Sequence, residues 1–222
     1  MAITRMIDID SHVLEPPDLW INNLEPRYKD RALRFEVDEK GWEYMCVDNS
    51  QYHGYFLDGG IFGRAGAGQP GRTRPIEDYL VPGMVTYDEG RPAGAYDPDE
   101  HIKVLDQRGI DMVILYPTMG ITWEWVCEDP SLALAYARVY NDWIANFCQK
   151  DPSRLAHVAH IPLRDVEGAV EEAKRVEGQG AKGLMIYGKP TNGGSYGDSY
   201  FDPFWYACQE LRLPVSLHAT GN

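Results

Sequence analysis

The sequence predicts an α/β protein built on a parallel β-sheet, and three observations support this. Apolar runs of strand length alternate with segments of helical periodicity from residue 97 onwards. The runs are apolar almost throughout, as in strands covered by helices on both faces. The segments 109–116 and 180–187 also resemble each other, because each begins with a glycine after a helix and ends an apolar strand in tyrosine. A chain of 222 residues can bury a substantial core around such a sheet.

The order of the elements follows from these runs and from their end signals. Asp97 and Pro98 suit the start of a helix, and Gly109 suits its end. Strands are expected at Ile3–Ile9, Met112–Tyr116, Leu155–Ile161, Gly183–Tyr187 and Pro214–His218. Helices are expected between them at 97–109, 132–147, 166–176 and 202–211.

An insertion is expected at residues 33–96. Leu33–Val37 and Trp42–Val47 flank a turn in which Gly41 can adopt a positive φ, which predicts a β-hairpin. Residues 54–94 are rich in glycine, proline and arginine and have little periodicity, so they fit either a linker or a long functional loop. Aromatic residues within the segment favour the loop. We therefore expect a single domain over 1–222 that carries a hairpin and a Gly/Arg-rich loop.

Composition limits the partners. The net charge of −13 argues against nucleic acid, because polyphosphate would be repelled. The four cysteines have no C-x-x-C spacing, which favours a reduced, cytoplasmic protein over a disulfide framework. The sequence shows neither a secretory signal nor an apolar stretch long enough to span a bilayer. A small molecule is therefore the expected partner. A small acidic molecule is compatible with the negative net charge of the chain, because it responds to the local field of its pocket.

Residues at the ends of the predicted strands could hold a metal. Function gathers at the C-terminal ends of parallel strands. Asp10 and His12 alternate with Ser11, so both side chains face one side of an extended chain. His218 ends the last strand. One carboxylate and two imidazoles are typical of a catalytic zinc site, although an Asp–His pair is also often a plain hydrogen bond.

The motif IDIDSHVLEP at 7–16 resembles the opening of the amidohydrolase-related family that includes aminocarboxymuconate-semialdehyde decarboxylase and the aromatic-acid decarboxylases. Residues 180–183, 200–205 and 213–218 are similar to further parts of that family. The resemblance implies a (β/α)₈ barrel of the TIM type with a divalent metal, most often Zn²⁺, with Mn²⁺ as an alternative. It matches Asp10, His12 and His218 to metal ligands, and it implies a homo-oligomer.

The resemblance also implies what the chain does. The family's catalytic histidine and a further aspartate follow strands six and eight, and neither has a counterpart here. We therefore expect the first five strands of a barrel, catalytic groups beyond residue 222, and little activity from these residues alone. The leading function is a metal-dependent carbon–carbon lyase, a decarboxylase of a carboxylated aromatic or enol-type acid. The alternatives are a metal-dependent hydrolase that uses metal-bound water, and an inactive partial barrel.

Four other residues are candidates for substrate binding. His160 lies near a strand end and could support the site or be a hydrogen-bonded core histidine. His53 and Arg64 lie in the Gly/Arg-rich loop, where Arg64 could pair with a carboxylate or remain solvated. Trp123 could form the wall of an aromatic pocket or pack against the next helix. His101 is expected to face solvent from its helix.

Overall fold

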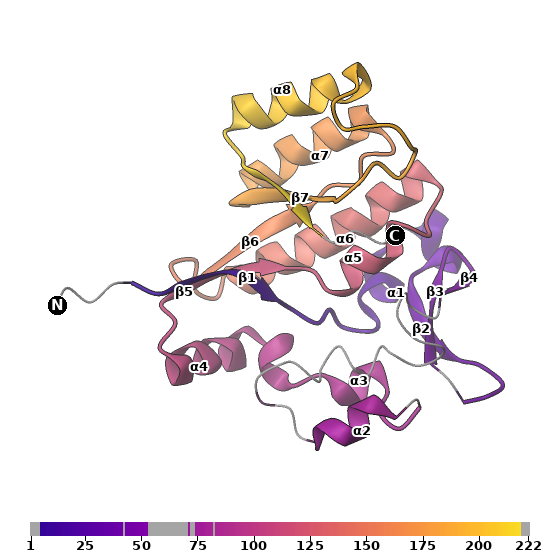
Figure 1. Cartoon of the computed structure of the whole chain (residues 1–222), viewed down its shortest axis with the longest axis vertical. Helices are drawn as coiled ribbons and strands as arrows, with labels where there is room; N and C mark the ends of the chain where they lie inside the picture. The colour runs from indigo at the N-terminus through magenta and orange to yellow at the C-terminus, as the bar shows by residue number, and fades with distance from the viewer. Residues whose placement is uncertain (1–4, 42, 53–70, 72–73, 82, 219–222) are drawn as a thin grey trace.

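The computed structural model describes residues 5–41, 43–52, 71, 74–81 and 83–218. Its main sheet has five parallel strands in the order β1-β5-β6-β7-β8, which confirms the predicted architecture (Figure 1). These strands are β1 (Ile7–His12), β5 (Met112–Tyr116), β6 (Leu155–His160), β7 (Gly183–Tyr187) and β8 (Val215–His218). The first strand lies further along the chain than expected. It continues through the polar residues up to His12.

The sheet is curled, and its two faces bury different side chains. Val113 and Leu115 point outward into the large apolar core under the helices. Ile114 and Tyr116 alternate with them and point inward, where Tyr116 packs with Val158 of β6. This alternation follows from the period of two residues in a strand. The inner face therefore forms the interior of a half-barrel.

Four long helices follow the strands as the sequence predicted. They are α4 (Pro98–Arg108), α6 (Pro130–Cys148), α7 (Val166–Gly178) and α8 (Asp202–Leu211). The Asp97 side chain accepts the first free N–H groups of α4, and Gly109 ends the helix with a φ of +67°. Helix α6 packs on β6, and α7 packs on α8. These helices cover the outer face of the sheet (Figure 1).

The predicted hairpin is present and gains a third strand. Strands β2 (Arg34–Val37), β3 (Glu43–Val47) and β4 (Ser50–Tyr52) form an antiparallel sheet. Gly41 has the expected positive φ of +81°. Asp48 and Asn49 also have positive φ values, as a tight two-residue hairpin turn requires, and this turn was not predicted.

One arginine ties this hairpin sheet to the main body. The Arg31 guanidinium donates to both carboxylate oxygens of Asp48 at 2.5 and 2.8 Å. It also donates to Asp129 at 2.8 Å, and Asp129 caps the start of α6. The hairpin turn is therefore fixed against the N-terminus of α6 by charge-assisted hydrogen bonds.

Several short helices complete the described chain. They are α1 (Leu19–Asn23), η1 (Pro26–Arg31), α2 (Ile76–Leu80), α3 (Tyr87–Gly90), η3 (Ala93–Ala95), α5 (Met119–Trp123) and η4 (Ser199–Phe201). Two of them, α2 and α3, lie within 54–94, and η3 begins there. The sequence indicated only irregular structure in this segment, because one helical turn is too short to give a periodic signal. Residues 53–70, 72, 73 and 82 of the expected loop lie outside the described residues. Among the described helices, none has the length and apolar character needed to cross a bilayer.

Candidate metal centre

Asp10, His12 and His218 converge at one end of the half-barrel. They come from β1 and β8, which are the two edges of the main sheet, and the curl of the sheet brings their side chains together. Their potential ligand atoms all lie within 4.8 Å of one another. His218 Nε2 is 3.1 Å from Asp10 Oδ1, and His12 Nε2 is 3.7 Å from the same oxygen. The three predicted metal ligands therefore form one cluster.

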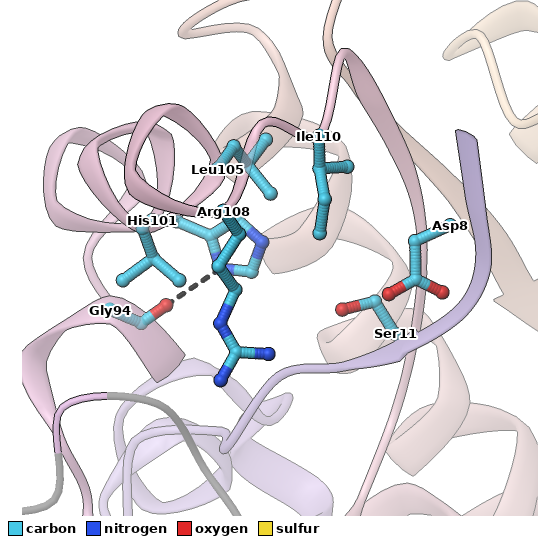
Figure 2. Close-up of a pocket in the computed structure, with 8 residues that line it drawn as sticks. Asp8, Ser11, Gly94, His101, Leu105, Arg108 and Ile110 are labelled. Carbon is cyan, nitrogen blue, oxygen red and sulfur yellow. Dashed lines mark hydrogen bonds between the residues drawn. The ribbon is translucent and has the colours of Figure 1, made fainter. Parts of the chain in front are cut away.

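A bulge in β1 determines where its side chains point. The register with β5 shifts between Asp8 and Ser11, so the simple alternation of faces is interrupted there. The Asp8 carboxylate accepts the backbone N–H of Asp10 at 3.1 Å, which supports the bulged backbone. Asp10 and His12 reach the cluster, whereas Asp8 and Ser11 point toward α4 (Figure 2).

The His12 ring is held in one orientation. Its Nδ1–H donates to the carbonyl oxygen of Pro117 at 2.8 Å, which leaves Nε2 free to act as a ligand. Burial lowers the pKa of His12, and the hydrogen bond to Pro117 opposes this effect only in part. The neutral imidazole is the form that binds a metal.

Glu15 holds the segment that supports His12. Its carboxylate is fully buried and accepts three consecutive backbone N–H groups, those of Thr118, Met119 and Gly120, at 2.9–3.1 Å. Burial raises the pKa of Glu15, and these backbone hydrogen bonds counteract the rise. Because Thr118 follows Pro117 directly, the Glu15 carboxylate fixes the carbonyl that orients His12.

His218 completes the cluster against an aromatic wall. The Tyr116 ring lies 5.0 Å from the His218 ring and 5.9 Å from the His12 ring, measured between centroids. His218 Nδ1 is buried and has no hydrogen-bond partner among the described residues. Two imidazole nitrogens and one carboxylate oxygen, with one histidine oriented by a carbonyl, fit a divalent metal such as Zn²⁺.

Comparison with known proteins shows the family of the chain. A family profile described as amidohydrolase matches residues 85–221, which is more than half of the chain. The chain belongs to the amidohydrolase family. This agrees with the resemblance of its opening motif.

Two curated relatives of this amidohydrolase are decarboxylases. The gamma-resorcylate decarboxylase of Rhizobium sp. (strain MTP-10005) is 32% identical over 126 residues, which are 54% of this chain and 38% of the relative. The 2-amino-3-carboxymuconate-6-semialdehyde decarboxylase of Dictyostelium discoideum is 27% identical over 127 residues, 57% of this chain and 34% of the relative. The chain thus spans less than half the length of either relative.

Solved structures agree on the fold. An amidohydrolase of Mycobacterium avium subsp. paratuberculosis K-10 superposes with a TM-score of 0.75 at 24% identity, over 99% of this chain and 59% of that protein. A dihydroxybenzoic acid decarboxylase of Polaromonas sp. JS666 was solved with manganese and the inhibitor 2-nitroresorcinol. It superposes with a TM-score of 0.55 at 17% identity, over 98% of this chain and 50% of that protein. The curled sheet of this amidohydrolase therefore corresponds to part of a TIM-type barrel.

The other candidate residues lie in different environments. His160 is fully buried, and its Nε2 lies 2.6 Å from the Glu124 carboxylate, so it is a hydrogen-bonded interior histidine. Trp123 is also fully buried and packs against Tyr136 and His160. His53 and Arg64 lie outside the described residues.

A small pocket lies between β1 and α4 (Figure 2). His101, which was expected to face solvent, is only 6% exposed and lines this pocket with Asp8, Ser11 and Arg108. The expectation was wrong because the first turn of α4 packs against η3. There the His101 Nδ1–H donates to the carbonyl of Gly94 at 2.6 Å.

Sequence reasoning did not identify Glu15, Pro117 or Glu124 as part of the site region. Glu15 did carry a signal, because a glutamate in front of two prolines cannot continue a helix and is placed in the loop after the first strand. Pro117 acts only through its carbonyl, and Glu124 acts through a contact with His160 across 36 positions. Neither contact has a local sequence signature.

Proposed function

We propose that this amidohydrolase is a metal-dependent decarboxylase of a carboxylated aromatic or enol-type acid. The observation that carries the proposal is the cluster of Asp10, His12 and His218, whose ligand atoms lie within 4.8 Å of one another. Both curated relatives described above are named decarboxylases of such acids. The structural relative from Polaromonas was solved with manganese and an aromatic inhibitor.

The residues of this chain prepare the site in three ways. Asp10, His12 and His218 would hold the ion, and Pro117 keeps His12 in the tautomer that exposes Nε2. A divalent ion bound there would supply Lewis-acid polarisation of a substrate oxygen. The buried Tyr116 ring packs against both histidines and forms the apolar wall behind them.

The proposed ion is Zn²⁺, because two imidazole nitrogens and one carboxylate oxygen form a zinc-type donor set. Mn²⁺ is the alternative, since it is present in the Polaromonas structure. Elemental analysis of protein purified without chelator tests the site and identifies the metal. A protein without metal that also fails to bind Zn²⁺ or Mn²⁺ on titration would refute the proposal.

The reaction itself is tested by trapping carbon dioxide. Metal-loaded protein is incubated with 2,6-dihydroxybenzoate and related hydroxybenzoates, and released carbon dioxide is measured with the decarboxylated product. Equimolar release supports the lyase. Substrate loss as a hydrolysis product, without carbon dioxide, would instead support a metal-dependent hydrolase on the same scaffold.

We also propose that the protein is a homo-oligomer of a reducing compartment such as the cytoplasm. The four cysteines are free and buried, as in a reduced protein. Both edge strands expose large apolar side chains, with Ile9 67% and Leu217 58% exposed. Such surfaces favour association. Light scattering that shows a monomer at all concentrations would contradict the oligomer.

A further inference from the structure

A lysine and a tryptophan lie near the end of β7, the strand that pairs with β8 and its His218, and neither belongs to the Asp10, His12 and His218 cluster. The starting point is Tyr187, the last residue of β7, which pairs in register with His218 of β8. Adjacent strands lie about 4.8 Å apart, so the chain after Tyr187 leaves the sheet one strand away from a metal ligand. Lys189 is therefore delivered to the edge of the sheet that carries the cluster.

The aromatic partner of this lysine is Trp125, which follows α5 by two residues. Helix α5 lies near the end of β7 (Figure 1). The Lys189 ammonium lies 4.5 Å from the centroid of the Trp125 ring, and that ring lies 6.2 Å from the Tyr187 ring. Trp123 and Glu124 directly before it are buried, yet Trp125 is 39% exposed. The indole is thus presented at the surface.

Lys189 has no acidic partner among the described residues. No carboxylate of the described residues lies within ion-pair distance of its ammonium, whereas Lys103 and Lys150 pair with Glu100 and Asp99. This is notable in a chain with a net charge of −13. A half-buried ammonium on an indole face attracts an anion more strongly than a fully hydrated one.

The backbone that carries Lys189 is fixed. The Tyr196 hydroxyl donates to the carbonyl of Tyr187 at 2.7 Å, and the Trp205 indole N–H donates to the carbonyl of Tyr196 at 2.9 Å. Tyr196 therefore anchors the end of β7 directly, and Trp205 holds the backbone of Tyr196. A site held in this way loses little conformational entropy when it binds a ligand.

We infer that Lys189 and Trp125 form a specificity subsite for aromatic acids that carry a second anionic group. This inference rests on the proposed function: one acidic group of the ligand would bind at the metal cluster, the ring would lie along the exposed Trp125 indole, and the second anionic group would pair with Lys189. Monocarboxylic aromatic acids would lack the last interaction. Lys189 is thus a specificity-determining residue and not a metal ligand.

The test uses simple ligands and the full 222-residue chain with saturating Mn²⁺. Calorimetry compares benzoate with phthalate, isophthalate and terephthalate, which place a second carboxylate at three positions. At least one dicarboxylate should bind about tenfold more tightly than benzoate, as a charge-assisted contact allows. Lys189→Met should remove this advantage and leave benzoate binding within twofold, and Lys189→Arg should restore most of it.

Two further variants sharpen the test. Lys182→Met removes an exposed lysine at the opposite end of β7. It should change the affinity for neither benzoate nor the dicarboxylates. Trp125→Leu should weaken all four aromatic acids. The inference is overturned if Lys189→Met weakens the binding of benzoate as much as that of the dicarboxylates. It is also overturned if Lys189→Met leaves dicarboxylate binding unchanged, or if the wild type binds no dicarboxylate more tightly than benzoate. If Mn²⁺ does not bind but the preference persists and depends on Lys189, the proposed function fails and the subsite stands.

Discussion

The His12 ring donates its Nδ1 proton to the carbonyl oxygen of Pro117 at 2.8 Å, across 105 positions of the sequence. This single bond makes the end of β5 responsible for the tautomer of a residue on β1. It also makes the proposed metal site depend on the buried carboxylate of Glu15, which holds the peptide between Pro117 and Thr118 in place.

A substitution in the ligand cluster should abolish metal binding without destabilising the fold. Asp10 has a side chain that is 66% exposed, so Asp10→Ala should leave the free energy of unfolding nearly unchanged and still abolish tight binding of Zn²⁺ or Mn²⁺. Asp30→Ala, at another exposed aspartate, serves as the matched control and should bind metal normally. Calorimetric metal titration and urea denaturation measure the two quantities. Unchanged metal affinity in the Asp10 variant would rule out this carboxylate as a ligand.

Asp8 should affect the metal without touching it. Its carboxylate accepts the N–H of Asp10 at the β1 bulge, so Asp8→Ala should weaken metal binding by about tenfold, the lower end of the effect expected for supporting residues. Asp8→Asn keeps an acceptor oxygen and should retain most of the affinity. Equal losses in both variants would mean that the charge of Asp8, and not its hydrogen bond, matters.

Glu15 should be important for stability and for the metal site together. Glu15→Ala would leave three buried N–H groups without partners, at a cost of about 3 kcal/mol or more in unfolding free energy. Metal affinity should fall as well, because Pro117 loses its support. Glu171→Ala on the exposed face of α7 is the matched control. Urea denaturation that shows a loss below 1 kcal/mol would contradict this role.

Glu43 should make stability depend on pH. Burial raises its pKa to about 7 from an ordinary value of 4.5, with further contributions from Asp88 and Glu89. The folded state therefore favours the protonated form. The stability that protonated Glu43 contributes to the folded state is fully present below pH 4.5 and is lost as the pH rises through 7.

Glu43→Gln keeps the acceptor for the Tyr87 N–H and removes this titration. The variant should gain stability over the wild type as the pH rises, by up to roughly 3 kcal/mol near pH 8. Thermal and urea unfolding at pH 5 and pH 8 measure the difference. A constant gap between the two proteins at both pH values would show that Glu43 does not titrate in this range.

Much of the fold was predictable because its signals are local. The strands from Met112 onwards are apolar runs, and Asp97 and Gly109 mark the ends of α4 directly. The first strand was placed too early because Asp10 and His12 are polar, and a polar run at a sheet edge gives no strand signal. The orientation of His101 depends on its packing against η3, which the sequence of one helix does not contain.

The clustering of the three candidate ligands was predictable because chemistry and topology agree on them. Asp10, His12 and His218 have ligand side chains and stand at strand ends, which a parallel sheet gathers at one edge. Their supports were not predictable. Glu15 and Pro117 act through backbone groups about a hundred positions away, and such partners become visible only when the chain is folded.

The β1 bulge makes this strand far more sensitive to length than to composition. Many single substitutions between Asp8 and Ser11 would leave the backbone path unchanged, whereas adding or removing one residue would exchange inward-facing and outward-facing side chains. His12 would then turn toward α4 and leave the cluster, whereas Asp8, on the other side of the change, would keep its direction. Evolution can therefore vary the chemistry of this segment one residue at a time, but it must keep the residue count.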